Sequence, residues 1–184
     1  MAHANLYRVI PYDASAAPTE RGGALFVPRG GENRIDNSTV YDVLYVAATR
    51  EGAIAETFAR LAVWTPDTFV HASGKAMTLL EYEVSDAITL FELDDVDALK
   101  SIDITRPRAV VTRDRAKTQA WARTIYERGG YTGARWWTYY QPDWTVVGLW
   151  DRSSVMTTNP PEPLTTAIPV VKAAAAAIVR QIAP

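Results

Sequence analysis

Four residues carry side chains that could act on a ligand bearing phosphate, a flat ring and a sugar. Arg34 follows two glycines in a polar loop, and a guanidinium group matches phosphate oxygens with a planar fork of donors. Tyr45 lies in the apolar run 43–47, where its ring could stack on a flat ligand. Glu56 could stabilise positive charge at a sugar carbon or orient a water molecule, and Thr138 adds a hydroxyl among aromatic residues.

Each of these residues, taken alone, also has an ordinary structural explanation. Arg34 is typical of a surface arginine, Tyr45 of a core tyrosine whose hydroxyl finds a partner, and Glu56 of a solvated carboxylate. Thr138 belongs to an aromatic strand face that could be either core or the floor of a pocket for a flat ring. A functional hypothesis therefore depends on the order and spacing of these residues together.

The sequence around Glu56 predicts a strand followed by a helix. Residues 43–47 are apolar and β-rich, which is typical of a buried strand, and Thr49 can cap the helix that follows. A helix is predicted over residues 50–62 because apolar residues recur at helical spacing, namely Ile54, Phe58, Leu61 and Ala62. Glu56 lies about 200° around this helix from Ile54, so it points away from the apolar stripe, into solvent or a cleft.

The remaining elements mix strands with a few helices. Strands are predicted at residues 6–10, 25–28, 80–84, 88–93, 134–140 and 145–150, and helical segments at 94–100, 114–128 and 169–182. Loops are predicted at 11–24, 29–37 and 65–75, and a Ser-, Thr- and Pro-rich linker at 153–168. Because strands and helices do not alternate regularly and no GxGxxG or Walker A segment is present, a doubly wound nucleotide-binding fold is disfavoured.

The composition excludes several kinds of site. The 184-residue chain contains no cysteine, which rules out disulfides, thiolate nucleophiles and zinc–sulfur centres. A histidine-based metal site or a Ser-His-Asp relay would depend on His71, because the only other histidine is His3 near the start of the chain. We interpret His71 as an ordinary loop histidine.

Charge and hydropathy limit the partners and the location of the protein. The net charge is −2, and the densest basic cluster, in residues 106–117, is interrupted by Asp114, so we interpret it as a solvated segment and expect no direct nucleic-acid binding. We expect no signal peptide, because no charged start is followed by an apolar run. No window approaches the ~18 apolar residues of a membrane-spanning helix. These observations predict a cytoplasmic protein.

Several short motifs, taken in order, resemble the RES-domain family, which is named for an arginine, a glutamate and a serine. They read LYRV at 6–9, GGENR at 30–34, LYVA at 44–47, AIAE at 53–56, GARWWT at 133–138 and VVGLWD at 146–151. Tyr45 lies 11 positions after Arg34, and Glu56 lies a further 11 after Tyr45, about as in the family. The resemblance runs from about residue 5 to residue 152.

Two departures from the family pattern stand out. The loop before Arg34 carries an insertion and lacks the tryptophan and asparagine of the family's GGRWN sequence. The signature serine falls on Thr138, which keeps the hydroxyl but adds a methyl group that restricts χ1 and takes up space. We therefore expect activity to survive at a reduced level.

The resemblance implies an α+β fold with an ADP-ribosyltransferase-like mixed β-core and flanking helices. It places a RES-like catalytic domain at residues 1–152, and we expect residues 153–184 to form the linker and a C-terminal helix that packs on the same domain. It also implies an enzyme that degrades NAD⁺ by hydrolysis or phosphorolysis. Such an enzyme needs no bound cofactor or metal, takes inorganic phosphate as co-substrate in the second case, and acts as a toxin paired with an Xre-like antitoxin. Family members also dimerise, which a flat aromatic surface would permit here.

The resemblance further assigns a role to each candidate residue. Arg34 and Arg8 suit the diphosphate of NAD⁺, and Tyr45 suits the nicotinamide ring. Glu56 suits the ribose hydroxyls and the charge that develops on the ribose, while Thr138 could hydrogen-bond the nicotinamide amide or the ribose.

Three other interpretations remain open at this point. A protein ADP-ribosyltransferase would use the same fold and a similar glutamate. A catalytically weak NAD⁺-binding module would account for the altered arginine loop and for Thr138. A globular protein of unrelated function would make the ordered motifs a coincidence.

Overall fold

The computed structural model describes residues 5–84 and 88–183, and within these ranges most strands join one strongly curled sheet. The sheet runs in the order β5-β6-β7-β2-β1-β4-β8, and β9 also pairs with β4. Its strands are β1 (Asn5–Pro11), β2 (Leu44–Ala47), β4 (Met77–Val84), β5 (Leu90–Glu92), β6 (Gly133–Trp137), β7 (Thr145–Leu149), β8 (Val155–Thr157) and β9 (Glu162–Pro163). The sheet is antiparallel except for the β5–β6 pair, which is parallel. The predicted α+β class is confirmed.

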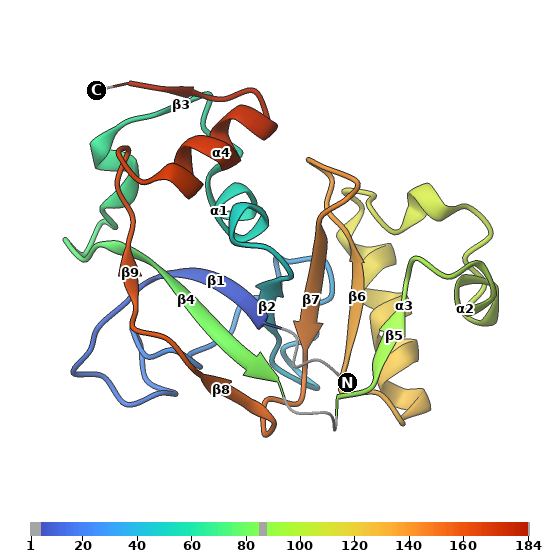
Figure 1. Ribbon diagram of the computed structural model, residues 1–184. Coiled ribbons are helices and arrows are strands. Elements are labelled where there is room, and N and C mark those ends of the chain that lie inside the picture. The colour runs from blue at the N-terminus through green and yellow to red at the C-terminus, as the bar shows by residue number, and fades with distance from the viewer. Residues whose placement is uncertain (1–4, 85–87, 184) are drawn as a thin grey trace.

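The sheet is nearly divided in the middle, between β1 and β2. The register between these two strands contains a single residue pair, Tyr7 with Ala47. By contrast β1 pairs with β4 along its whole length, and β2 pairs with β7 at all four of its residues. The two strands therefore diverge from one contact point, and Figure 1 shows the molecule opening there into two halves.

The helices cover the two halves separately. In one half α1 (Arg50–Phe58) packs against α4 (Pro169–Ala177), and both share an apolar core with β1 and β4. In the other half α2 (Val96–Ser101) and α3 (Arg115–Arg128) form a second core with β5 and β6. Figure 1 shows α1 and α4 on one side of the divide and α2 and α3 on the other. The short elements are η1 (Pro66–Phe69), η2 (Pro107–Ala109), β3 (Val63–Trp64) and β10 (Gln181–Ile182).

Local sequence signals explain where the main helices begin and end. The Thr49 hydroxyl accepts a hydrogen bond from the Gly52 N–H and caps α1, as the sequence predicts. The Asp114 carboxylate caps α3 in the same way through the Lys117 N–H. The α3 helix ends at Arg128, and the next residue, Gly129, has a φ of 72°, which glycine adopts without steric cost.

Several predicted elements differ from the structure, and tertiary contacts explain most of the differences. Residues 25–28 form no strand, because guanidinium groups bind the backbone carbonyls at Leu25 and Phe26. The helix predicted to reach residue 62 ends at Phe58, and Leu61 is 46% exposed. The predicted strand 134–140 ends at Trp137, where the chain turns. Residues 153–168, predicted as a linker, contain β8 and β9, which extend the sheet beside β4.

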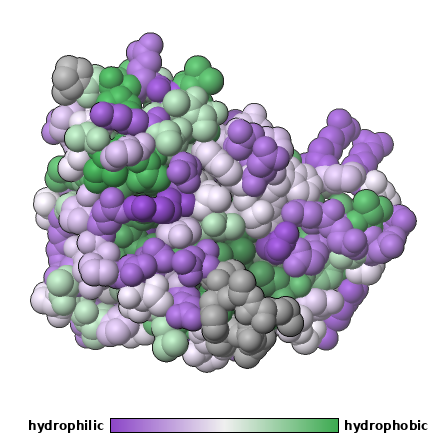
Figure 2. Space-filling view, in the orientation of Figure 1, coloured by the Kyte–Doolittle hydropathy of each residue, from purple (hydrophilic) through white to green (hydrophobic). Residues whose placement is uncertain are grey.

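The C-terminal end of the chain closes onto α1. The helix predicted over 169–182 stops at Ala177, and β10 then pairs in parallel with β3. The Arg180 guanidinium donates two hydrogen bonds to the Ala59 carbonyl, at 2.8 and 3.0 Å, and so satisfies an acceptor at the end of α1. Apolar side chains near this end, including Leu61, Val63 and Val179, are exposed, and green surface is visible over α4 and β3 in Figure 2.

No helix within residues 5–84 and 88–183 is both long enough and apolar enough to span a bilayer.

Candidate active site

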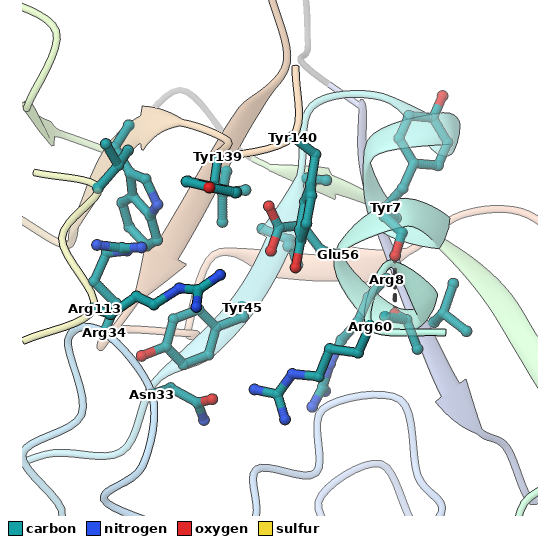
Figure 3. Close-up of a pocket in the computed structure, with 18 of the residues that line it drawn as sticks. Tyr7, Arg8, Asn33, Arg34, Tyr45, Glu56, Arg60, Arg113, Tyr139 and Tyr140 are labelled. Atoms are coloured by element: carbon teal, nitrogen blue, oxygen red, sulfur yellow. Dashed lines mark hydrogen bonds between the residues drawn. The ribbon is translucent and has the colours of Figure 1, made fainter. Parts of the chain in front are cut away.

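A cavity of about 670 Å³ lies where the sheet divides, which is within the usual size range of small-molecule sites. Both diverging strands contribute to it, β1 through residues 7–9 and β2 through residues 45–47. The helix that follows β2 forms one wall, and the loops at 33–34, 111–115 and 139–140 form the others. The topology therefore collects residues from segments far apart in the sequence, including Trp136 of β6 and Val146 of β7, around one opening, which Figure 3 shows in close-up.

One stripe of α1 faces this cavity. The stripe consists of Ala53, Glu56 and Thr57, whose spacing of three and four residues places them on a single side of the helix, and Arg60 follows in the turn after α1. The other side carries Ile54, Ala55 and Phe58, which are buried in the core shared with α4. The sequence placed Glu56 off the apolar stripe, and the structure shows that its side borders a cavity rather than open solvent.

Glu56 is the acidic residue among those that line the cavity. Its side chain is exposed to the cavity, but protein atoms displace much of the water around the carboxylate. This desolvation raises the pKa of Glu56 above its ordinary value, while the guanidinium groups of Arg34 and then Arg115 act in the opposite direction. Figure 3 shows the carboxylate directed into the cavity beside the ring of Tyr140.

Arg34 reaches the cavity from the opposite loop and is held in place by backbone carbonyls. One of its terminal nitrogens donates hydrogen bonds to the carbonyls of Val110 and Thr112, the latter at 2.9 Å. Burial lowers the pKa of Arg34, followed by repulsion from Arg115, whereas Glu56 raises it. Since one nitrogen is committed to the protein, the rest of the guanidinium group is free to face a ligand.

Helix α3 fixes the loop that carries Arg34. The Gln119 side-chain amide donates to the carbonyls of Gly31 at 2.7 Å and Asn33 at 2.9 Å. Arg115 donates to the Glu32 carbonyl at 3.2 Å. These bonds pair the backbone carbonyls of three successive residues, 31–33, in an irregular loop. Side chains of α3, and not a neighbouring strand, therefore position the loop.

Tyr45 connects the same loop to β2. Its hydroxyl donates to the Asp36 carboxylate at 2.7 Å and accepts from the Ile35 N–H at 3.1 Å. Burial, together with the nearby Asp36 charge, raises the pKa of Tyr45, so the hydroxyl keeps the proton that it donates. Its ring lies edge-on to Trp136, with 6.3 Å between centroids, and lines the cavity. The hydroxyl therefore positions the Arg34 loop, while the ring is available to a ligand.

Arg8 also lines the cavity, from β1. One of its terminal nitrogens donates to the Phe26 carbonyl at 2.8 Å. Burial lowers the pKa of Arg8, and the neighbouring Tyr82 hydroxyl opposes this shift. The structure thus brings four of the five sequence-derived candidates, Arg8, Arg34, Tyr45 and Glu56, to one cavity.

Thr138 is placed differently from the other candidates. It is only 2% exposed and does not line the cavity. Its hydroxyl accepts hydrogen bonds from the N–H groups of Tyr140 at 3.2 Å and Gln141 at 3.0 Å, and it donates to the Gln141 carbonyl at 3.1 Å. Thr138 therefore holds the turn between β6 and β7, and it is Tyr139 and Tyr140 in this turn that border the cavity.

Three arginines of the cavity were not identified from the sequence as site residues. Arg60 lies four residues after Glu56, in the turn after α1 and within the helix predicted over 50–62, so the helical period would have placed it on the same face as Glu56. Arg113 and Arg115 belong to the basic segment 106–117, which the sequence analysis interpreted as solvated. That interpretation is wrong for Arg115, which is half-buried and bonds the Arg34 loop, whereas Arg113 is exposed and lies over the ring of Tyr139 at the edge of the cavity.

The charge balance of the cavity suits an anionic ligand that also carries a cationic centre. Its lining contains Glu56 and five guanidinium groups, those of Arg8, Arg34, Arg60, Arg113 and Arg115. Guanidinium groups bind phosphate oxygens, and a carboxylate among them can face positive charge on a sugar carbon or activate an oxygen nucleophile. Within the described ranges, no group of three or more His, Cys, Asp or Glu residues could hold a metal ion.

The chain is similar to known proteins in sequence and in structure. The family model of the RES domain matches residues 5–167. The chain belongs to the RES-domain family. No curated protein matches the chain. A solved structure that is similar to this RES domain is the crystal structure of the M. tuberculosis MbcT–MbcA toxin–antitoxin complex. It matches with a TM-score of 0.63 at 14% sequence identity, and the match covers 95% of this chain and 90% of that chain.

The structural match shows that this RES domain shares its α+β fold with a chain of that complex. The match extends over nearly the whole chain, and the family model itself ends at residue 167. Residues 155–163, which pair with β4, therefore lie inside the region that the RES model matches.

Proposed function

We propose that this RES domain is an enzyme that cleaves the bond between nicotinamide and ribose in NAD⁺. The observation that carries the proposal is the convergence of Glu56, Arg34 and Tyr45 on one cavity beneath an aromatic turn, among guanidinium groups. NAD⁺ combines the three features this cavity could bind: a diphosphate, a flat cationic ring and a ribose. RES-domain proteins degrade NAD⁺, which is the activity that the family membership favours.

Cleavage of this bond places specific demands on the site. The bond between the ribose C1′ and the nicotinamide nitrogen breaks with both electrons going to the nitrogen, so the leaving group becomes neutral and needs no general acid. The ribose is left with positive charge shared between C1′ and its ring oxygen, as in glycoside cleavage. An ionised Glu56 stabilises this charge or the ribose hydroxyls, while Arg34 and Arg8 hold the diphosphate and Tyr45 contacts the nicotinamide ring.

The acceptor of the ADP-ribosyl group distinguishes two forms of the reaction. Water forms a new C1′–O bond, loses a proton and yields ADP-ribose. Inorganic phosphate forms the bond through one of its own oxygens and yields ADP-ribose 1″-phosphate. Thr138 takes part indirectly in both cases, because it positions Tyr139 and Tyr140 at the mouth of the cavity. The first reaction would make the protein an NAD⁺ glycohydrolase, and the second an NAD⁺ phosphorylase.

We further propose that the enzyme acts as the toxin of a toxin–antitoxin pair. The similar solved structure is a complex of a toxin with its antitoxin, and the likeness extends over most of both chains. Depletion of NAD⁺ would arrest growth, and an antitoxin of the Xre-like kind implied by the family resemblance would prevent it. Co-expression with the product of the adjacent gene should restore growth to cells that the RES domain alone arrests.

Incubating the purified protein with NAD⁺ tests the activity and names the acceptor. We expect free nicotinamide to appear, and mass spectrometry of the second product, with and without phosphate, separates ADP-ribose from its phosphate ester. The same reaction with NAD⁺ labelled in the adenosine part distinguishes the alternative enzyme. A label that becomes attached to a protein would identify an ADP-ribosyltransferase, and a folded protein that binds NAD⁺ without releasing nicotinamide would be a binding module.

A further inference from the structure

The cavity carries more positive charge than NAD⁺ requires. Five arginines and one glutamate are the charged residues of its lining. The diphosphate of NAD⁺ brings about two negative charges, and the positive charge of the nicotinamide and ribose part balances that of Glu56. Three guanidinium groups therefore remain without a negative partner on the substrate.

The five arginines also differ in how they are held. Arg8, Arg34 and Arg115 each donate to backbone carbonyls of the protein. Arg113 lies over the ring of Tyr139, with 5.6 Å from its guanidinium carbon to the ring centroid. These four side chains therefore have a protein group that fixes or covers them.

Arg60 is the exception among these arginines. Within residues 5–84 and 88–183 the structure gives its guanidinium group no hydrogen bond, ion pair or aromatic contact. Glu56 lies four residues earlier, in the last turn of α1, whereas Arg60 lies in the turn after the helix, and the two side chains do not pair. Figure 3 shows Arg60 extending away from Glu56, across the cavity from Arg34 and Arg113.

We propose that Arg60 marks a subsite for a phosphate group that is separate from the diphosphate. The inference rests on the proposed function, since it assumes that Arg34 and Arg8 hold the diphosphate. A phosphate monoester brings about two further negative charges near neutral pH, and the planar fork of a guanidinium group binds two of its oxygens at once. Two ligands present such a group: the 2′-phosphate of NADP⁺, and free orthophosphate bound beside NAD⁺.

Binding measurements in a Glu56→Gln background, where turnover is removed, test the subsite. If the subsite takes the 2′-phosphate of NADP⁺, we expect the protein that retains Arg60 to bind NADP⁺ more tightly than NAD⁺. R60Q should then reduce that preference about ten- to hundredfold. If the subsite takes orthophosphate, we expect the two dinucleotides to bind with equal affinity and orthophosphate to bind to the NAD⁺ complex. R60Q should then weaken the binding of orthophosphate by the same factor.

Two arginine variants serve as matched controls in these measurements. R113Q removes a cavity arginine on the opposite side, so we expect it to weaken both dinucleotides equally and leave their ratio unchanged. R108Q removes an exposed arginine outside the cavity, and we expect it to change nothing.

The outcomes separate this proposal from the proposed function. An R60Q protein with an unchanged NADP⁺ to NAD⁺ ratio and unchanged orthophosphate binding overturns the subsite, even if the wild-type protein cleaves NAD⁺. A ratio that R113Q alters and R60Q does not would also overturn it. If R60Q weakens phosphate binding but the wild-type protein does not cleave NAD⁺, the subsite stands and the proposed reaction is refuted. Failure of both dinucleotides to bind would refute both proposals.

Discussion

Replacing Thr138 by valine separates a positioning role from direct contact with the substrate. Valine has nearly the same shape as threonine, so the change removes the hydroxyl and its three hydrogen bonds to the turn at residues 140–141. At about 1 kcal/mol for each bond, in a turn that water can partly reach, we expect a loss of about 2–3 kcal/mol in the free energy of unfolding. For a chain of this length that corresponds to a fall in Tm of about 4–12 °C.

The kinetic consequence follows from what the turn carries. Loosening it frees Tyr139 and Tyr140 at the edge of the cavity, so we expect Thr138→Val to raise KM more than it lowers kcat in a nicotinamide-release assay. Thr138→Ser keeps the hydroxyl and should retain wild-type Tm to within a few degrees, together with most of the activity. A Thr138→Val protein with an unchanged Tm and a collapsed kcat would refute this reasoning, because the hydroxyl would then act on the substrate itself.

Three further predictions concern the loop and the acid of the site. Tyr45→Phe keeps the ring but loses the bonds to Asp36 and Ile35, so we expect about 2–3 kcal/mol lower stability in denaturant unfolding and a higher KM. The pKa of Glu56 is raised and the reaction needs this carboxyl ionised, so kcat/KM should fall on acidification at a pH above the ordinary glutamate pKa. Arg115→Gln removes a charge that lowers this pKa, so it should move the acidic fall in kcat/KM to a still higher pH. A raised carboxyl pKa in the folded state contributes stability below the unfolded pKa and loses it as pH rises through the folded one. Glu56→Gln should therefore be more stable than wild type at pH 8 in thermal unfolding, with a difference that shrinks on acidification, and a pH-independent difference would contradict the raised pKa.

Periodicity in the sequence was sufficient to predict the elements that carry Glu56 and Tyr45. The apolar run at 43–47 and the helix behind Thr49 are both present, and Glu56 lies on the side of the helix that faces away from the core. These predictions succeed because burial of an apolar face sets both the period and the direction of the polar residues between. The ends of elements were less predictable, since contacts such as that of Arg180 with Ala59 come from distant parts of the chain.

The sequence could not reveal which polar side chains are committed to the protein. Thr138 and Arg34 look alike as candidates in the sequence, but only the fold shows that the Thr138 hydroxyl is used within a turn. Likewise, the helical period could have identified Arg60, whereas Arg113 and Arg115 depend on the path of the chain between η2 and α3. Convergence of loops is a long-range property, and local residue patterns do not encode it.

The most direct test of the central claim is nicotinamide release from NAD⁺ by Glu56→Ala beside Glu51→Ala. Both glutamates lie on α1, but Glu51 lies outside the cavity lining, so it serves as a matched control for charge and helix position. We predict that Glu51→Ala releases nicotinamide at close to the wild-type rate and that Glu56→Ala, with an unaltered circular dichroism spectrum, releases none above background. A folded Glu56→Ala protein that still releases nicotinamide would contradict the account.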